Sequence, residues 1–195
     1  MLTGIIAVII AYLLGSIPFA YIISRWSKGV DIREIGVKNV GAANVGREIG
    51  LREGLAVGVL DCAKGVAAVL IAIMLQCAAL WIMAAGAAAV LGHNFPVFLR
   101  FKGGKGAATT VGIFLALTPV PMLIDLVLLI ILYAFIRKIF VVNCFVFPAL
   151  SLLIWLIAGN ATLALYALGI TIFMAIRTFP WRSIVKTVRS HLKSD

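Results

Sequence analysis

The sequence predicts an all-α integral membrane protein in which residues 1–195 form a single domain of seven transmembrane helices. Apolar residues make up 64% of the chain and the mean hydropathy is +1.16, whereas soluble domains average about 45–50% apolar residues. These residues occur in runs that approach the length needed to cross a bilayer. Of the 17 Lys and Arg residues, all except Lys64 fall in the segments that follow odd-numbered runs.

The first three expected spans are separated by one long polar segment and one short turn. The first span is interrupted at Gly15-Ser16-Ile17-Pro18, because proline disfavours helix at its own position and at the residue before it. The segment that follows is too charged to lie in lipid. These spans are expected at residues 3–24, 54–75 and 77–99.

The second half of the chain contains four further spans. Its first apolar run is too long for one span, and Thr118-Pro119-Val120-Pro121 divides it. The fourth span then has about 11 residues, which cover only about half of the hydrocarbon thickness. Gly159-Asn160 separates the last two spans. The four spans are expected at residues 107–117, 122–136, 139–158 and 161–176.

The distribution of positive charge predicts the orientation. Because basic segments stay in the cytosol, the N-terminus is expected outside and the C-terminus in the cytosol. Membrane topology and anionic ligands then account for the net charge of +10, and no nucleic-acid partner is expected. The expected cytosolic segments are about residues 25–53, 100–106, 137–138 and 177–195.

Two cytosolic segments have the composition of an anion site. One is the loop F-K-G-G-K-G at residues 101–106, where glycines let backbone N–H groups approach an anion and two lysines add charge. The other, residues 36–47, is rich in glycine and asparagine and ends on Arg47, and arginine binds phosphate in a bidentate manner. The alternatives are a tight turn with solvated lysines and an irregular interfacial loop.

Ionisable residues inside the expected spans are a third signal. Asp61 and Lys64 lie three residues apart on one helical face, either as a structural ion pair or as part of an anion site. His93 ends the third span and is, as a lone histidine, more often structural than catalytic. Asp125 has no evident partner in the sequence.

Several catalytic patterns are missing from the sequence. Phe98 stands where a His-x-x-x-x-Asp acyltransferase motif beginning at His93 needs an aspartate. The chain has no Cys/His cluster for a metal and no G-x-x-x-x-G-K-[ST] phosphate loop. No metal and no cofactor are therefore expected.

The motifs taken together resemble a known family. They read G-S-I-P in the first span, D-I-R-x-x-G-x-x-N-V-G-A-x-N at 31–44, L-D-x-x-K-G at 60–65 and G-H-N-F-P-V-F-x-x-F-K-G-G-K-G at 92–106. This ordered set is similar to the acyl-phosphate-dependent glycerol-3-phosphate acyltransferases of bacteria, the PlsY family, and covers essentially the whole chain with the same seven-span layout.

The resemblance implies an enzyme of phospholipid synthesis in the bacterial inner membrane, with its active site facing the cytosol. Its substrates would be acyl phosphate and glycerol 3-phosphate, its product lysophosphatidic acid, and its surroundings membrane lipid. A functional link to an enzyme that forms acyl phosphate also follows. The resemblance implies catalytic roles for Lys105 and Arg47. It implies substrate binding by Asn39, Gly41, Asn44, Lys64, His93, Lys102, Gly103, Gly104 and Gly106.

The chain departs from the family pattern at three places. Val37 stands where the family usually has serine, and Ala43 where it usually has threonine. The third family motif, R-H-R-x-N-I, is unmatched after Arg177, where the sequence reads Thr178-Phe179-Pro180-Trp181. Two alternatives therefore remain: a paralogue with an altered acceptor or lost activity, and a transporter of a phosphorylated metabolite, which needs openings on both faces.

Overall fold

The structure of the protein is a computed structural model that describes residues 1–137 and 139–179. Within these ranges the fold is all-α, as the sequence predicts. The elements are α1 (Leu2–Ser16), α2 (Phe19–Lys28), α3 (Ala42–Glu48), α4 (Leu51–Met74), α5 (Ala79–Asn94), the short 3-10 helix η1 (Val97–Leu99), α6 (Ala107–Leu117), α7 (Pro119–Ile136), α8 (Ile139–Ala158) and α9 (Ala161–Thr178).

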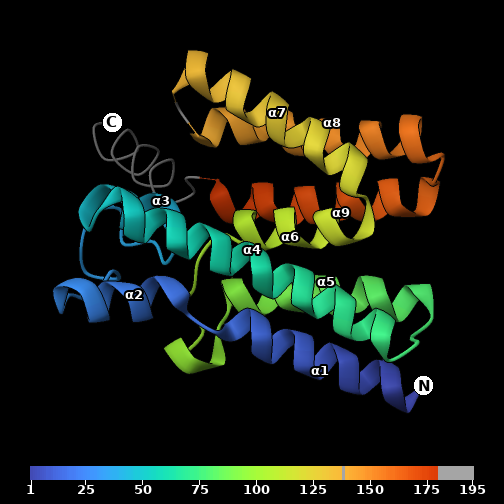
Figure 1. The fold of residues 1–195 in the computed structure, drawn as a ribbon, viewed down its shortest axis with the longest axis horizontal. Coiled ribbons are helices and arrows are strands. Elements are labelled where there is room, and N and C mark those ends of the chain that lie inside the picture. The colour runs from blue at the N-terminus through green and yellow to red at the C-terminus, as the bar shows by residue number, and fades with distance from the viewer. Residues whose placement is uncertain (138, 180–195) are drawn as a thin grey trace, which may run out of the picture.

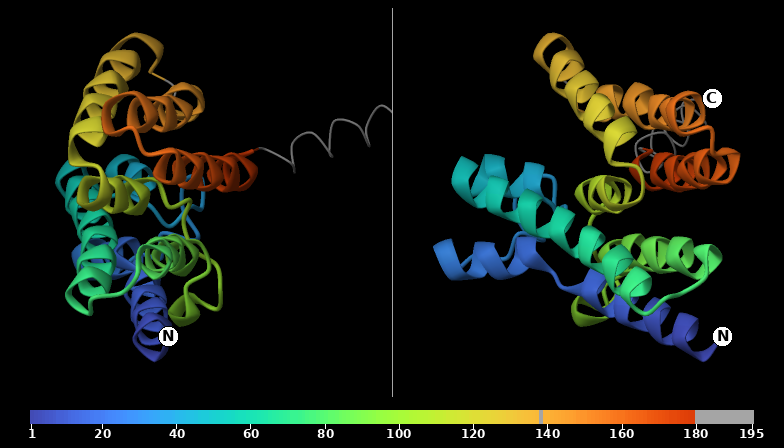
Figure 2. Two further views of the ribbon diagram at one scale, coloured as in Figure 1. Left: turned by 90° about the vertical axis from the view of Figure 1, so that its right-hand side faces the viewer. Right: turned by 45° about the vertical axis from the view of Figure 1, so that its right-hand side comes forward.

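The long helices form two groups with α6 between them (Figures 1 and 2). Helices α1, α4 and α5 contact one another in the first group, and α8 contacts both α7 and α9 in the second. Helix α6 contacts α4, α5 and α7, and each of its residues is buried or half-buried. The centre of the bundle is therefore a short helix enclosed by protein.

The expected count of seven spans is wrong, because six helices in the described part of the chain are long and apolar enough to cross a membrane. The exception is α6, whose 11 residues rise about 16 Å against about 30 Å of hydrocarbon. Helix α6 ends at Leu117 because prolines at 119 and 121 begin the next helix. The six long segments are Leu2–Lys28, Leu51–Met74, Ala79–Leu99, Pro119–Ile136, Val141–Ala158 and Ala161–Thr178.

Glycines allow α6 to approach α4 closely. A Cβ added at Gly65 of α4 would contact the carbonyl oxygen of Thr109, and one at Gly112 of α6 would contact the carbonyl oxygen of Cys62. Small residues let helix backbones come together in this way inside membranes. The position of α6 against α4 therefore depends on these two glycines.

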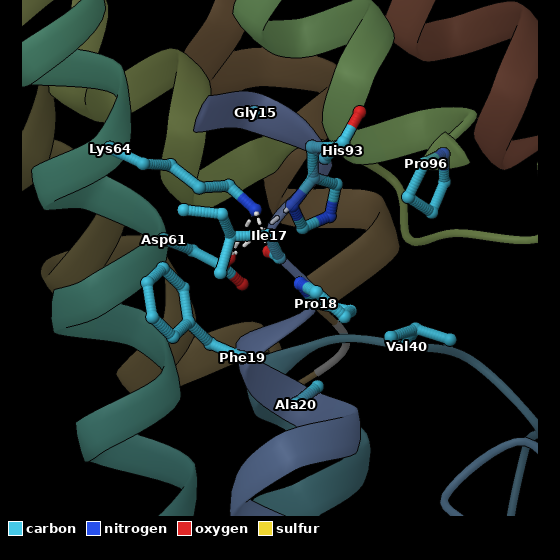
Figure 3. A pocket seen from close by; sticks show the side chains of 11 residues that line it. Gly15, Ile17, Pro18, Phe19, Ala20, Val40, Asp61, Lys64, His93 and Pro96 are labelled. Atoms are coloured by element: carbon cyan, nitrogen blue, oxygen red, sulfur yellow. Dashed lines mark hydrogen bonds and ion pairs between the residues drawn. The ribbon is translucent and has the colours of Figure 1, made fainter. Parts of the chain in front are cut away.

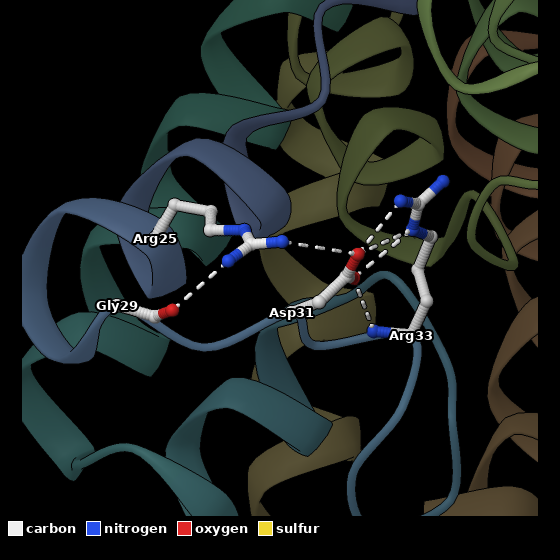
Figure 4. A network of polar contacts seen from close by, with 4 residues as sticks. All are labelled: Arg25, Gly29, Asp31 and Arg33. Atoms are coloured by element: carbon white, nitrogen blue, oxygen red, sulfur yellow. Dashed lines mark hydrogen bonds and ion pairs between the residues drawn. The ribbon is translucent and has the colours of Figure 1, made fainter.

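The polar segment between α2 and α4 is held by buried polar groups. The Asp31 carboxylate accepts hydrogen bonds from the backbone N–H and the guanidinium of Arg33, and Arg25 lies 3.8 Å from it (Figure 4). These hydrogen bonds from Arg33 outweigh desolvation and lower the pKa of Asp31 below its ordinary value. The carboxylate is therefore charged at neutral pH, and its contacts hold the start of the polar segment against the end of α2.

Candidate active site

A cavity of about 230 Å³ brings together segments that are far apart in the sequence. The polar segment before α4 forms one wall. The C-terminal end of α5 and the N-terminal end of α6 form a second. Helices α8 and α9 complete it. The lining residues are Val37, Asn39, Gly41, Ala42, Ala43, Arg47, Asp61, His93, Lys105, Gly106, Ala107, Ala108, Asn143, Met174 and Thr178.

Two cations line this cavity in the described part of the chain. Arg47 lies in the last turn of α3, and Lys105 precedes α6. The pKa of Lys105 is lowered, first by partial burial, which disfavours the charged ammonium, and then by the positive charge of Arg47. Two like charges that repel each other across a cavity favour an anion between them.

The N-terminus of α6 adds backbone donors to the same cavity. Ala107 and Ala108 line it, and no side chain among the described residues caps the helix. The first N–H groups of a helix have no partner within the helix, and its dipole attracts negative charge there. Gly106 makes this geometry possible, because its φ of +86° is unfavourable for other residues. The helix start, Lys105 and Arg47 therefore present positive potential to one space.

The N–H groups of the other two loop glycines are used differently. The N–H of Gly103 donates to the carbonyl oxygen of Asn94 at 3.2 Å, and that of Gly104 donates to the carbonyl oxygen of His93 at 3.1 Å. A Cβ at Gly104 would contact His93 Nε2 and the Val40 carbonyl oxygen. These glycines attach the loop to the end of α5, so the N–H groups available to an anion are those of the first turn of α6.

Asn44 lies behind the cavity wall, where it organises the polar segment. It is buried, and its Oδ1 accepts a hydrogen bond from the Val37 N–H at 3.1 Å. Its Nδ2 donates to the carbonyl oxygens of Ile32, Ile35 and Asn39. One side chain therefore determines how Val37 and Asn39 reach the cavity.

A buried charged cluster connects three elements beside the cavity. Lys64 Nζ lies 2.7 Å from Asp61 Oδ1. It also donates a hydrogen bond at 3.0 Å to the carbonyl oxygen of Ile17, which lies in the interruption between helices α1 and α2. His93 Nδ1 lies 3.5 Å from the same Asp61 oxygen, and Figure 3 shows these side chains converging. The space beside Lys64 is about 10 Å³, at most enough for one water molecule. Asp61 and His93 also line the large cavity, whereas Lys64 does not.

We expect Asp61→Ala to destabilise the protein strongly. The change leaves the Lys64 ammonium, which is 5% exposed, without its carboxylate, and breaking a buried ion pair costs about 3–5 kcal/mol. Thermal unfolding in detergent measures the loss, and the double variant Asp61→Ala/Lys64→Met should recover part of it. If Asp61→Ala unfolds at the parent temperature, the ion pair does not hold these helices.

The structure thus brings six of the expected site residues to one cavity, and the others lie outside its lining. The six are Asn39, Gly41, Arg47, His93, Lys105 and Gly106, and the others are Asn44, Lys64, Lys102, Gly103 and Gly104.

The contributions of α8 and α9 were not predicted from the sequence. Asn143 and Thr178 line the cavity, and the guanidinium of Arg177 lies 4.6 Å from the ring centre of Phe95, which joins α9 to the end of α5. An amide within the apolar run of α8 was the available signal for Asn143. The region of the unmatched third motif beyond Phe179 lies outside the described residues.

Comparisons with known proteins agree with this geometry. The family model described as Glycerol-3-phosphate acyltransferase matches residues 5–187. The glycerol-3-phosphate acyltransferase of Geotalea daltonii is 38% identical over 190 residues, which are 97% of this chain and 96% of that protein. Glycerol-3-phosphate acyltransferase 5 of Dehalococcoides mccartyi is 48% identical over 125 residues, so that the match spans 64% of this chain and 54% of the relative.

A solved structure shows the same fold. The crystal structure of PlsY, an integral membrane glycerol 3-phosphate acyltransferase, in its glycerol 3-phosphate form is similar with a TM-score of 0.84 and 32% identity. The similarity covers 96% of this chain and 92% of that one. The chain carries an ordered set of motifs, matches the family model over nearly its whole length and shares the fold of a solved member. It therefore belongs to the glycerol-3-phosphate acyltransferase family, PlsY.

Proposed function

We propose that this chain is a membrane enzyme that transfers a fatty acyl group from acyl phosphate to glycerol 3-phosphate and releases lysophosphatidic acid and phosphate. The observation that carries the proposal is the convergence of Arg47, Lys105 and the N-terminus of α6 on one cavity among apolar helices. A cavity of this kind suits two phosphates and one apolar chain. The donor would come from an enzyme that forms acyl phosphate.

The chemistry needs positioning more than a strong base. The hydroxyl oxygen of the acceptor attacks the acyl carbon, the bond from that carbon to the phosphate oxygen breaks, and the hydroxyl proton leaves with the phosphate. Because acyl phosphate is a mixed anhydride with a good leaving group, the remaining work is to align the reactants and stabilise negative charge. Lys105 and Arg47 bind the phosphates in this proposal. The alternative of a metabolite transporter has no observation in its favour.

An assay of the purified protein in lipid nanodiscs tests the proposal. Labelled glycerol 3-phosphate and acyl phosphate should give labelled lysophosphatidic acid and one phosphate for each product molecule. Acyl-coenzyme A and acyl carrier protein serve as alternative donors. Transfer from one of these donors but not from acyl phosphate would contradict the proposed donor, and turnover with another acceptor alone would support the paralogue.

We also infer that the N-terminus lies outside and the C-terminus in the cytosol of a bacterial inner membrane, with the cavity facing the cytosol. Support comes from the basic segments and from Figure 1, where α6, although too short to span, runs back between α5 and α7, so that the N-terminus and the end of α9 lie at opposite ends of the bundle. Single cysteines near each terminus of a cysteine-free variant should be labelled from opposite sides. Labelling of both from one side would overturn this orientation.

Val37→Ser should raise turnover on glycerol 3-phosphate if the chain is a weakened enzyme of the family. Val37 is 66% exposed and lines the cavity, and one hydrogen bond to a charged group is worth about 1.5–3 kcal/mol, or roughly ten- to 150-fold in rate. The gain should be clearest with Ala43→Thr, since Ala43 lines the same wall. Initial rates measure the effect.

A matched control is Val97→Ser, which adds the same hydroxyl at an exposed valine outside the cavity lining. It should leave the rate unchanged. If the chain is a paralogue, Val37→Ser leaves turnover on glycerol 3-phosphate near zero. If Val37→Ser leaves the rate of an active protein unchanged with every acceptor, Val37 does not contact substrate.

A further inference from the structure

The side chains of Asp61 and His93 are shared by two spaces of different size. Both line the active-site cavity of about 230 Å³, and both also line the space of about 10 Å³ beside Lys64. Asp61 is 2% exposed and His93 is 7% exposed. The two side chains therefore form a buried, polar part of the wall of the active-site cavity.

The surroundings of the His93 ring determine which of its two nitrogens carries the proton. Nδ1 lies 3.5 Å from Asp61 Oδ1, and a carboxylate beside this nitrogen favours a proton there. The Lys64 ammonium, 2.7 Å from the same oxygen, already neutralises the carboxylate, and Arg47 and Lys105 line the cavity as well. Because these three cations disfavour a charged imidazolium, the surroundings favour a neutral ring with its proton on Nδ1 and a free electron pair on Nε2.

The Nε2 atom is the ring nitrogen left for a ligand. Figure 3 shows Nδ1 turned towards Asp61 and the other nitrogen turned away, and Nε2 makes no hydrogen bond with any residue that the structure describes. A Cβ added at Gly104 would contact Nε2, so this atom lies against the glycine that precedes Lys105 in the loop. A ligand whose phosphate meets the Lys105 ammonium can therefore reach Nε2 with a second group.

The cationic part of the cavity lacks acceptors. Lys105, Arg47 and the first N–H groups of α6 donate hydrogen bonds and accept none, which suits the oxygens of phosphates. The acceptor substrate also carries a hydroxyl group, which is itself a donor. An acceptor for its proton is needed if an electron pair of the hydroxyl oxygen is to point at the acyl carbon.

The amide oxygens of Asn39 and Asn143 are the competing acceptors in the cavity lining. Both side chains are half-buried, and neither amide is held by a hydrogen bond to a described residue. The His93 ring is held on two sides, by Asp61 at Nδ1 and by Gly104 at Nε2. His93 is therefore the acceptor with a fixed direction.

We infer that His93 Nε2 accepts a hydrogen bond from the attacking hydroxyl group of glycerol 3-phosphate, and that Asp61 is the positioning residue that keeps the ring proton on Nδ1. The inference rests on the proposed function. The hydrogen bond aims an electron pair of the hydroxyl oxygen at the acyl carbon. As the new bond to this carbon forms, the bond from the carbon to the phosphate oxygen breaks. The phosphate leaves with the bonding electrons and the hydroxyl proton, and His93 is neutral before and after the reaction.

Nitrogen NMR of the His93 ring tests the inference without turnover. The chain has two histidines, so a His191→Gln protein with isotopically labelled histidine gives the ring signals of His93 alone. The proton should be found on Nδ1. Glycerol 3-phosphate should shift the Nε2 resonance, whereas n-propyl phosphate, which has the phosphate but no hydroxyl group, should not. A proton on Nε2, no shift with glycerol 3-phosphate or equal shifts with both ligands overturns the inference.

The same spectra separate this inference from the proposed function. Acyl transfer to glycerol 3-phosphate without a shift of the Nε2 resonance leaves the function standing and overturns the inference. A hydroxyl-dependent shift in a protein that cannot acylate glycerol 3-phosphate supports the hydrogen bond and contradicts the function.

Replacing the whole charge pair tests the role of Asp61. Asp61→Leu/Lys64→Met leaves no buried charge without a partner, so the protein should fold. Without the carboxylate, Nε2 should carry the proton in most of the protein. The kcat should then fall about 100-fold with a smaller change in the KM for glycerol 3-phosphate, as expected for a misaligned hydroxyl group. A folded double variant that keeps the proton on Nδ1, or keeps a kcat within about twofold of the parent, overturns the inference.

Asp125→Leu is the matched control for this variant. Asp125 is a fully buried aspartate of α7 that lies outside the lining of both spaces. The same substitution there should leave both the ring signals of His93 and the kcat unchanged. A change of the His93 signals as large as that in Asp61→Leu/Lys64→Met would show that they report general perturbation of the bundle, and would overturn the assignment of Asp61.

Two amides at position 93 separate the acceptor at Nε2 from the contact with Asp61. Glutamine places its amide near the position of Nε2, and asparagine places its amide near that of Nδ1. His93→Gln should therefore keep a kcat within about tenfold of the parent, whereas His93→Asn should lose about 100-fold although it retains a polar group beside Asp61. Thermal unfolding shows whether both variants are folded. Equal kcat values in the two folded variants overturn the inference.

Discussion

Lys105→Ala should abolish acyl transfer while the protein still inserts and folds. The Lys105 side chain lines the cavity with Arg47 and the start of α6, so its loss removes the charged contact to a phosphate that we propose for it and that alanine cannot replace. Loss of one such electrostatic contact in an active site typically lowers the rate about 100- to 1,000-fold. Rates and thermal unfolding of the same preparation measure both effects. Arg100→Ala is the matched control, because Arg100 precedes the same loop but lies outside the cavity lining.

The pH dependence provides an independent check on Lys105. Since burial and Arg47 lower the pKa of Lys105, the free enzyme loses this positive charge at a lower pH than a solvated lysine does. The kcat/KM for a phosphate substrate should therefore fall on the alkaline side below pH 10.5, the ordinary lysine value. Lys105→Arg should move this fall to higher pH.

Activity of Lys105→Ala within a few-fold of the parent would contradict the assignment of phosphate binding to this residue.

Gly112→Ala should destabilise the protein and slow acyl transfer together. The added Cβ would contact the Cys62 carbonyl oxygen and lie 2.8 Å from the carbonyl carbon, which are rigid backbone atoms of α4. Overpacking of a well-packed core typically costs about 1–3 kcal/mol, and separation of α6 from α4 also displaces the start of α6 at the active site. Thermal unfolding and initial rates measure the two effects, and both the unfolding temperature and the rate should fall.

Gly169→Ala provides the matched control, because no heavy atom of a neighbouring element in the described structure lies within 4 Å of a Cβ at this position in α9. It should leave activity unchanged and raise stability slightly, since alanine favours helix over glycine by about 1 kcal/mol. If Gly112→Ala and Gly169→Ala have the same unfolding temperature and the same rate, α6 can move away from α4 without loss of stability or activity.

Hydropathy and proline positions predicted the helices well, because each signal is local to its segment. The break at Gly15–Pro18 and the division at Thr118–Pro121 both occur in the structure. The count of spans failed at α6, since an apolar run shows that a helix avoids water but not whether it contacts lipid or protein. Its enclosure by α4, α5 and α7 is a tertiary property.

Cavity-lining residues on loops rich in charge and glycine could be predicted from the sequence, and those on uniformly apolar helices could not. Arg47 and Lys105 stand out in sequence because charge and glycine surround them. Asn143 lies in a 20-residue helix with no other cue to its neighbours, so its place beside the cavity depends on how α8 and α9 pack. The glycines of the loop illustrate a different limit: the sequence predicts exposed N–H groups, whereas those of Gly103 and Gly104 bond to the end of α5.

The short α6 has a consequence for how this protein responds to its bilayer. A lone helix of 11 residues would force lipid to thin around it. Here the neighbouring helices separate it from lipid, so hydrophobic mismatch acts on the six long segments and not on the wall that carries Ala107 and Ala108. Changing the acyl length of the host lipids should alter the stability of the bundle while turnover remains nearly constant. The geometry of the candidate active site therefore does not depend on membrane thickness.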